Sequence, residues 1–256
     1  MPDKSFWNSK TVFITGHTGF KGSWLSYWLR LLGANVYGYA LNPETEPNLF
    51  HAAGLANDMD SRIGDIRDED KLHAELKQVK PDIVLHLAAQ ALVRESYENP
   101  LDTFQTNIMG TANLFEAIRI SCPKAIVQHC STSEVYGDVR PEDVPINEDC
   151  PLRPVSPYAV SKTAQDHLAY AYFKSFGLQI IRTRMFTYFN PRRSDLFSTS
   201  FAKQIIEIEN RDRAVLKHGN LKSIRTMVDV RDAMKAYWLA SVMCEPGEVY
   251  NIGGTK

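Results

Sequence analysis

The chain has 256 residues, a formal net charge of −1 and 44% hydrophobic residues. That length suits one large domain, or one domain with a smaller lobe. The balanced charge argues against nucleic acid or an anionic membrane as a partner. The four cysteines form no CxxC pair, and no apolar run approaches the length of a membrane span. Residues 1–10 are polar and lack the apolar core of a signal peptide, so we expect a cytoplasmic protein.

Apolar, β-branched runs alternate with amphipathic stretches along the chain, which favours a parallel sheet covered on both faces. In chain order, the pattern predicts a strand at 11–15, a helix closed by Gly33, a strand at 35–41, a short apolar segment before Asp65, a helix at 68–79, a strand at 82–89, a helix at 111–121, a strand at 125–131, a helix at 156–177 and a strand at 178–186.

The regular alternation loosens after residue 186, where a loop precedes a predicted helix at 198–211. We therefore expect a dinucleotide-binding domain over 1–186. A smaller substrate region is expected over 187–256, partly interleaved with that domain, at the carboxyl end of the sheet where open parallel sheets bind ligands.

The segment "TGHTGFKG" joins the first predicted strand to the first predicted helix. Its glycines, Gly16, Gly19 and Gly22, suit a tight turn, close approach of a pyrophosphate and close helix–strand packing. The helix N-terminus then offers free N–H groups to phosphates. The second strand ends in "YALNP", with neither an acid for the ribose of NAD nor an arginine for the 2'-phosphate of NADP. Asn42 is the candidate for the ribose, which favours NAD and leaves NADP open.

Tyr158 and Lys162 lie four residues apart, on one face of a predicted helix. A lysine ammonium beside a phenol favours the phenolate, so Tyr158 can act as a base near neutral pH. The same helix holds a second match, Tyr170 and Lys174. We interpret that second pair as structural, because it lies more than three turns beyond the helix start.

Five segments in order carry a family resemblance: "TGHTGFKG", "HLAAQ", "TN" with "GT" at 106–111, "STSEVYG" and "SPYAVSK". Together they resemble the extended short-chain dehydrogenases/reductases, and more narrowly the nucleotide-sugar 4,6-dehydratases. The resemblance implies a Rossmann-like, doubly wound α/β fold with a small C-terminal substrate lobe. "GHTGFKGSWLS" and "HLAAQALVRESY" are most similar to CDP-glucose 4,6-dehydratases. "TSEVYG" and "PRRSDLF" are more similar to the GDP-mannose type.

The resemblance implies that Tyr158 takes a proton from the C4 hydroxyl of the sugar, with Thr132 bonded to the same oxygen. Glu134 would then remove the C5 proton, and Glu134 or a water it holds would help the C6 hydroxyl to leave. Two alternatives stay open. One is a 4-ketoreductase or 4-epimerase, which needs no such carboxylate. In the other, Glu134 only caps a loop through backbone N–H groups.

Further site residues come with the resemblance. The candidates for cofactor contact are Gly16, Thr18, Gly19, Phe20, Gly22, Asn42, Asp65, Ile66, Leu87, Ala88, Ala89, Tyr158 and Lys162. The candidates for contact with a nucleotide-diphosphate sugar are Gln90, Arg94, Ser133, Thr187, Arg193 and Arg225. The arginines suit phosphate oxygens, although each can also be an ordinary surface side chain. Asp65 either receives the adenine amino group or caps the next helix.

The resemblance implies that Asn107 holds a helix bend near the tyrosine, and that the chain forms a homodimer or homotetramer. His86 and His129 lie in apolar strands, and we expect both to be satisfied core residues. No His, Asp or Glu cluster has the spacing of metal ligands. The segment 187–190 departs from the family pattern, and the substrate region is expected to be shorter than in relatives.

Overall fold

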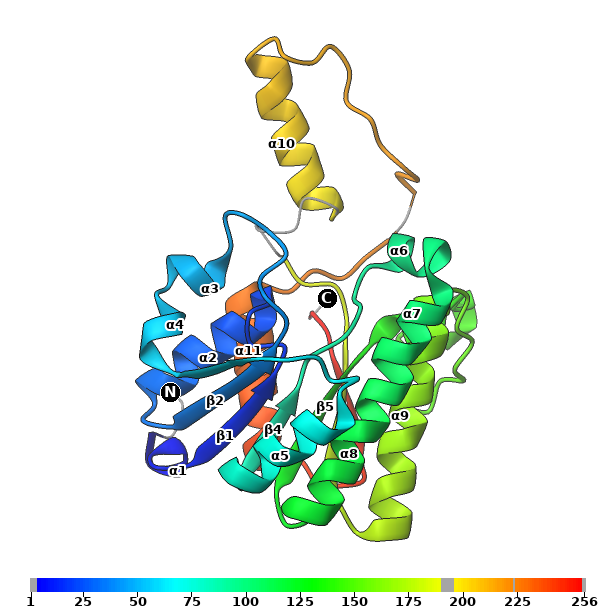
Figure 1. Ribbon diagram of the computed structural model, residues 1–256. Coiled ribbons are helices and arrows are strands. Elements are labelled where there is room, and N and C mark those ends of the chain that lie inside the picture. Colours follow the sequence, from blue (N-terminus) through cyan, green and yellow to red (C-terminus); the bar gives the residue numbers. More distant parts are fainter. Residues whose placement is uncertain (1–3, 190–195, 223, 255–256) are drawn as a thin grey trace.

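The computed structural model describes residues 4–189, 196–222 and 224–254. Its centre is a seven-stranded sheet in which every neighbouring pair of strands is parallel, in the order β3-β2-β1-β4-β5-β6-β7 (Figure 1). The strands are β1 (Thr11–Thr15), β2 (Asn35–Ala40), β3 (Asp60–Ile63), β4 (Ile83–His86), β5 (Ile126–Thr132), β6 (Gln179–Met185) and β7 (Val249–Ile252).

The helical segments connect these strands. The α-helices are α1 (Lys4–Trp7), α2 (Phe20–Leu31), α3 (Leu49–Ala52), α4 (Leu55–Asp58), α5 (Glu69–Val79), α6 (Val93–Glu98), α7 (Pro100–Phe104), α8 (Gly110–Ser121), α9 (Pro157–Phe176), α10 (Phe197–Glu209) and α11 (Val230–Met243). A π-helical turn covers Gln105–Met109, and 3-10 turns cover Ser133–Tyr136 and Pro141–Asp143.

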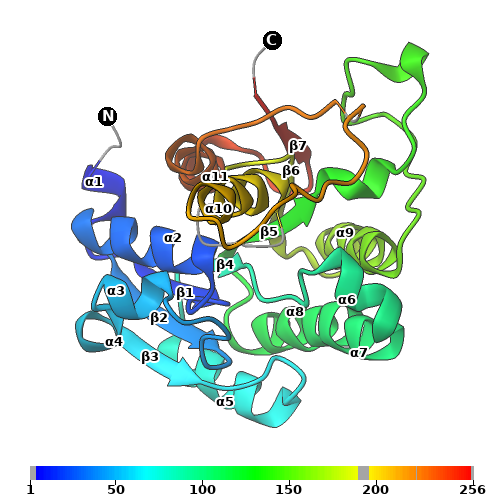
Figure 2. The same cartoon turned by 90° about the horizontal axis from the view of Figure 1, so that it is seen from above.

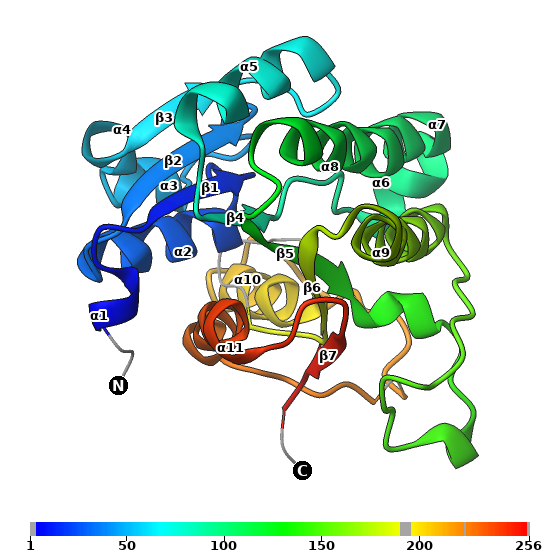
Figure 3. The same cartoon turned by 90° about the horizontal axis from the view of Figure 1, so that it is seen from below.

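Helices cover both faces of the sheet, as Figures 2 and 3 show from its two ends. Helices α2 and α11 pack on one face, and α5, α8 and α9 form a layer on the other. Strand β1 feeds both cores, because alternate residues of a strand face opposite ways. Val12 and Ile14 join the α2–α11 core, whereas Phe13 joins the core beneath α5 and α8. The predicted Rossmann-like fold is confirmed.

The order of the strands positions the site. From β1 the chain crosses to β2 on one side, while β4 adds to the other side. The loops that follow β1 and β4 therefore separate at the carboxyl edge of the sheet and leave a crevice between them, where ligands of such sheets bind. The strand predicted over 82–89 ends at His86, and residues 87–89 belong to this loop.

The region 187–256 divides into two parts in the structure. Helix α11 packs on β5, β6 and α2, and β7 pairs with β6 as the edge strand. Helix α10 stands beyond the carboxyl edge of the sheet (Figure 1). Assigning 187–256 to substrate binding remains a prediction, and α10 is the part of that region that projects beyond the site edge.

Candidate active site

The turn between β1 and α2 is built on glycine. Gly16 has φ of 77°, a conformation that L side chains rarely adopt, and a Cβ there would lie 2.8 Å from the backbone nitrogen of Ala88. A Cβ on Gly22 would lie 2.1 Å from the carbonyl oxygen of Gly16, so the first turn of α2 packs directly on the loop. Gly19 is the exposed N-cap residue of α2. The turn thus leaves backbone N–H groups at the N-terminus of α2 uncovered by side chains, which fits the binding of a dinucleotide pyrophosphate.

Two neighbouring loops border this turn. The hydroxyl of Thr18 donates to the carbonyl oxygen of Leu41 at 2.8 Å, and exposed Asn42 follows directly. On the other side, the backbone N–H of Ala88 donates to Thr15 Oγ1 at 3.2 Å. The structure therefore places several predicted cofactor residues where the neighbouring strands β1, β2 and β4 end: Gly16, Thr18, Gly19, Phe20, Gly22, Asn42, Leu87, Ala88 and Ala89.

Asp65 does not cap the helix that follows it. The N-cap of α5 is Asp68, whose carboxylate accepts from the backbone N–H of Lys71. The Asp65 carboxylate instead accepts from the backbone and guanidinium of Arg67, and this pairing holds the pKa of Asp65 below its usual range. Ile66 beside it is buried. Of the two alternatives left open for Asp65, the capping one is wrong, and a role at adenine remains a prediction.

Replacing Gly22 by alanine is expected to destabilise the turn, because the new Cβ meets backbone, which cannot swing aside as a side chain does. Overpacking of this kind costs about 1–3 kcal/mol. Thermal unfolding and NAD binding by fluorescence would measure it. Gly219→Ala is the control, since a Cβ there meets nothing within 4 Å. Equal unfolding temperatures and equal NAD affinity for the two variants would contradict the packing argument.

Helix α9 presents the predicted catalytic pair at its first turns. The Ser156 hydroxyl caps the helix by accepting from the N–H of Ala159 at 3.0 Å, which sets the half-buried Tyr158 in the first turn. Lys162 is buried, and its ammonium donates to the carbonyl oxygen of Cys130 on β5 at 2.7 Å. The lysine is thereby fixed against β5 near its carboxyl end, and the tyrosine lies one helical turn before it.

Burial lowers the pKa of Lys162 to about 7, and the charge of Lys21 contributes to this shift. The unfolded chain binds this proton up to a pH near 10.5, whereas the folded chain releases it near 7. Between these values the unfolded state holds more protons, so the free energy of unfolding rises with pH, by up to about 1.4 kcal/mol per pH unit. Below pH 7 both states are protonated and the penalty of burying the charge is complete.

We therefore expect the free energy of unfolding of wild type to rise relative to that of Lys162→Met between pH 7 and pH 9.5. Denaturant titrations at several pH values would measure the difference. Lys174→Met is the control, because Lys174 is exposed on the same helix and should leave the wild-type slope unchanged. Parallel pH profiles for wild type and Lys162→Met would contradict the shift.

Strand β5 ends at Thr132, and the chain turns at once into the 3-10 segment Ser133–Tyr136. Thr132 Oγ1 accepts from the backbone N–H of Glu134 at 3.3 Å, so the threonine caps this turn. Within the described residues, the Glu134 carboxylate has no hydrogen-bond partner, so the loop-capping alternative through its carboxylate lacks support. Thr132, Ser133 and Glu134 are each half-buried, at the edge where Lys162 meets β5.

Asn107 lies in the π-helical turn between α7 and α8 and is fully buried. Its amide accepts from the N–H of Gln90 at 2.8 Å, and donates to the carbonyl oxygen of Gln90 and to the hydroxyl of Ser161. It thus ties the loop after β4 to the helix that carries Tyr158. The Gln90 side chain is engaged with the backbone of Leu92. The expected helix irregularity at Asn107 is present.

The two strand histidines differ. His86 is a satisfied core residue, because its ring nitrogens bond the hydroxyls of Thr15 and Thr111, both at 2.8 Å. His129 is fully buried with neither ring nitrogen partnered among the described residues, so the expectation of a satisfied residue is wrong there. Its ring lies beside those of His86 and Phe115, and burial holds its pKa well below the usual range, so it is neutral.

The predicted sugar and phosphate contacts are less closely gathered. Thr187 is half-buried just after β6, and its carbonyl oxygen accepts from the N–H of Val228 at 3.1 Å. Arg94 on α6 and Arg225 in the loop before α11 are exposed. Arg193 lies outside the described residues.

Lys21 was not singled out in the sequence, although it stands inside "TGHTGFKG". Its ammonium lies over the rings of Tyr188 and Tyr237, at 5.5 and 5.3 Å from their centroids, and 3.3 Å from the Tyr237 hydroxyl. It joins the glycine-rich turn to the loop after β6, within the segment that departs from the family pattern. A lysine in a first helical turn normally points to solvent, so no pattern could have revealed this cage.

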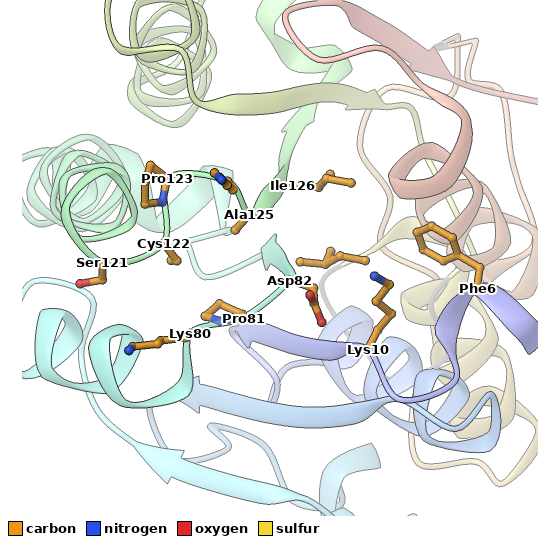
Figure 4. A pocket seen from close by; sticks show the side chains of 12 residues that line it. Phe6, Lys10, Lys80, Pro81, Asp82, Ser121, Cys122, Pro123, Ala125 and Ile126 are labelled. Atoms are coloured by element: carbon orange, nitrogen blue, oxygen red, sulfur yellow. The ribbon is translucent and has the colours of Figure 1, made fainter.

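A hollow at the opposite edge of the sheet takes no part in this site (Figure 4). It lies where β4 and β5 begin, and Phe6, Lys10, Asp82 and Cys122 are among its lining residues. Asp82 already accepts from the N–H of Thr11, and Lys10 lies over the Phe6 ring. Burial raises the pKa of Cys122 to about 11, which keeps the thiol protonated.

Over 4–189, 196–222 and 224–254, no group of three His, Cys, Asp or Glu side chains could hold a metal ion. In the same ranges, no helix is long and apolar enough to span a bilayer.

The family model for GDP-mannose 4,6 dehydratase matches residues 13–256. The chain belongs to that family. CDP-glucose 4,6-dehydratase of Salmonella typhimurium is 48% identical over 177 residues, which are 69% of this chain and 49% of that enzyme. The chain thus spans about half the length of this curated relative.

Solved structures of relatives agree with the fold. RMD from Pseudomonas aeruginosa, complexed with NADPH, is 28% identical with a TM-score of 0.80, covering 97% of this chain and 79% of that one. DesIV, a dTDP-glucose 4,6-dehydratase from Streptomyces venezuelae with NAD and TYD bound, is 28% identical with a TM-score of 0.81, covering 96% and 76%. The predicted nucleotide-sugar 4,6-dehydratase family is thereby confirmed.

Proposed function

We propose that the chain is a nucleotide-sugar 4,6-dehydratase that holds NAD at the glycine-rich turn. The observation that carries this proposal is the Glu134 carboxylate, which has no hydrogen-bond partner among the described residues and lies two residues beyond Thr132, at the end of the strand that anchors Lys162. Proton removal at C4 alone needs only a Ser or Thr with the Tyr158–Lys162 pair. A second carboxylate at that edge suits a second proton transfer at another carbon.

Each residue then has a task. Tyr158 accepts the proton of the C4 hydroxyl, while Lys162 favours its phenolate and Thr132 donates to the same oxygen. The resulting ketone acidifies the C5 hydrogen, and Glu134 takes that proton. The C6 hydroxyl leaves as water with the proton that Glu134 took from C5. As C6 is reduced, C5 takes up a proton from solvent, and Tyr158 releases to solvent the proton it took from the C4 hydroxyl. A bound nicotinamide would accept hydride from C4 and return it to C6, so no cofactor would be consumed.

NAD is the favoured cofactor, and NADP is a second possibility. The loop after β2 presents Asn42 without an acid or an arginine beside it, and neutral hydrogen bonds from an asparagine suit a ribose hydroxyl. The relatives solved with NADPH and with NAD support binding of either at the same turn.

GDP-mannose is the favoured substrate, converted to GDP-4-keto-6-deoxymannose. The family model and the Glu-Val-Tyr-Gly segment at 134–137 support this substrate. CDP-glucose is the alternative, which the 48% identity to the Salmonella enzyme supports. The diphosphate is proposed to contact Arg94, Arg193 and Arg225. The sugar is proposed to contact Gln90, Ser133 and Thr187. A 4-ketoreductase or epimerase on the same scaffold remains the competing activity.

We further propose that the chain acts as a homodimer or homotetramer in the cytoplasm. Leu101 on α7 and Met109 in the π-helical turn expose 74% and 56% of their surface on adjoining segments, which supports a subunit contact there.

The test is incubation with GDP-mannose, CDP-glucose, UDP-glucose and dTDP-glucose in separate reactions, each without cofactor and then with NAD or NADP, read by mass spectrometry. Loss of one water from a single substrate without net cofactor reduction is the expected result. Turnover of a keto-sugar with consumption of reduced cofactor, and no loss of water from any of the four, would overturn the proposal in favour of the reductase.

A further inference from the structure

A buried carboxylate continues the catalytic face of α9. Tyr158, Lys162 and Asp166 lie at successive four-residue steps, so they share one face of the helix. Asp166 is only 1% exposed, and none of the roles proposed above uses it. A buried carboxylate is costly unless charged partners compensate it, so its surroundings carry information.

Two arginines of β6 and one residue of β5 meet this carboxylate. Arg184 donates from Nε to Asp166 Oδ2 at 2.9 Å, and Arg182 donates from Nη1 to Oδ1 at 3.1 Å. The hydroxyl of Ser131 donates to Oδ2 at 3.1 Å. Ser131 is the residue directly before Thr132, so Asp166 fixes the end of β5 to the helix that carries the tyrosine and lysine.

The other end of Arg184 reaches the turn that carries Glu134. Its Nη1 donates to the hydroxyl of Tyr136 at 2.9 Å, and its guanidinium lies 5.1 Å from the centre of that ring. The Tyr136 hydroxyl in turn donates to Asn251 Oδ1 on β7 at 2.7 Å. Tyr136 is fully buried and stands two residues after Glu134, in the same 3-10 turn.

The network therefore joins five elements, namely α9, β5, β6, β7 and the 3-10 turn. Buried ion pairs add little net stability, because desolvation offsets their attraction, but they can fix one arrangement among several. Here the arrangement that they fix is the spacing between the Tyr158–Lys162 face and the Thr132–Glu134 turn.

We propose that Asp166, Arg184 and Tyr136 are positioning residues, which hold the Thr132–Glu134 turn in register with the Tyr158–Lys162 face of α9. The inference rests on the proposed dehydratase function. None of the three touches the substrate in this proposal. They act through Ser131, through the 3-10 turn and through the helix, and their effect falls mainly on the step that needs Glu134.

Tyr136→Phe is the informative variant, because it removes one hydroxyl and keeps the buried ring and the charged groups of Asp166, Arg182 and Arg184. Variants of Asp166 leave two arginines without their carboxylate and are expected to destabilise the fold. For Tyr136→Phe, we expect elimination of water to slow by about tenfold to a hundredfold, since small misplacements of a catalytic group cost that much. KM should stay within about twofold, and transfer of hydride between C4 and the bound nicotinamide (C4 exchange), followed by the absorbance of the reduced nicotinamide, should continue.

Tyr172→Phe is the matched control. Tyr172 lies on α9, and its hydroxyl is 3.4 Å from Glu116 and away from the turn. It should leave both partial reactions unchanged. Equal slowing of C4 exchange and elimination by Tyr136→Phe, or no slowing of either, would overturn the positioning role.

A second readout needs no substrate. Amide hydrogen exchange should quicken in residues 131–137 of Tyr136→Phe and stay at the wild-type rate in the last turns of α9. If wild type eliminates water from none of the nucleotide sugars, the proposed function fails. The pattern of amide exchange then decides the positioning role by itself. Unchanged exchange in 131–137 would overturn it.

Discussion

Glu134→Gln is expected to separate the two halves of the reaction. The amide has nearly the shape of the carboxylate but accepts no proton, so it cannot take the C5 hydrogen. Removal of a general base typically costs about 10²–10⁴-fold in rate. Oxidation at C4 uses Tyr158, Lys162 and Thr132, so C4 exchange of hydride with the bound nicotinamide should continue. Mass spectrometry of the product would follow elimination, and the absorbance of the reduced nicotinamide after substrate is added would follow oxidation at C4.

Asp138→Asn is the control for this variant, since Asp138 is an exposed carboxylate four residues along the same loop. It should eliminate water at the wild-type rate. Unchanged elimination by Glu134→Gln would remove Glu134 as the base, whereas loss of C4 exchange together with elimination would mean that the residue serves the first step.

Tyr158→Phe is expected to stop both halves. Without the phenol no group takes the proton of the C4 hydroxyl, so no ketone forms and the C5 hydrogen is never acidified. We expect a loss of about 10²–10⁴-fold in C4 exchange and in water elimination alike. Binding of NAD, followed by fluorescence titration, should stay close to that of wild type, because the glycine-rich turn is untouched.

The chain supplies its own control in the second tyrosine–lysine match. Tyr170 is 42% exposed, and the Lys174 ammonium lies over its ring at 5.6 Å, a contact that phenylalanine also makes. Tyr170→Phe should therefore retain full activity. Loss of activity in Tyr170→Phe, with full activity in Tyr158→Phe, would reverse the assignment of the two pairs.

Local sequence was sufficient for the cofactor turn and for most of the sheet, although the edge strand β7 was not predicted. Gly16 needs a positive φ and Gly22 needs contact with backbone, and both demands show as glycines between an apolar run and an amphipathic one. The apolar strands revealed the parallel sheet, because strands buried on both faces read as continuous apolar runs. The Tyr158–Lys162 pair was likewise visible, since helix periodicity alone puts both on one face.

Long-range polar pairing was not visible in the sequence. Asp166 and Arg184 are 18 residues apart on a helix and a strand, and either residue alone suggests an ordinary charged surface side chain. Lys21 and Tyr188 meet across the fold in the same way. His129, whose ring nitrogens have no partner in the described part of the chain, packs among buried rings, and an apolar run that contains one histidine does not specify this packing. Asp65 and Asp68 are equally suited to cap α5 by composition, and only the chain path selects Asp68.

The most direct test of the account uses nucleotide sugar labelled with deuterium at C4, incubated in ordinary water with wild-type protein. In a 4,6-dehydratase the label moves from C4 to C6 of the same molecule, while the C5 hydrogen comes from solvent. The account therefore predicts a product lighter by one water that retains the label at C6. Substrate or epimer that keeps deuterium at C4, with no labelled product lacking water, would contradict it.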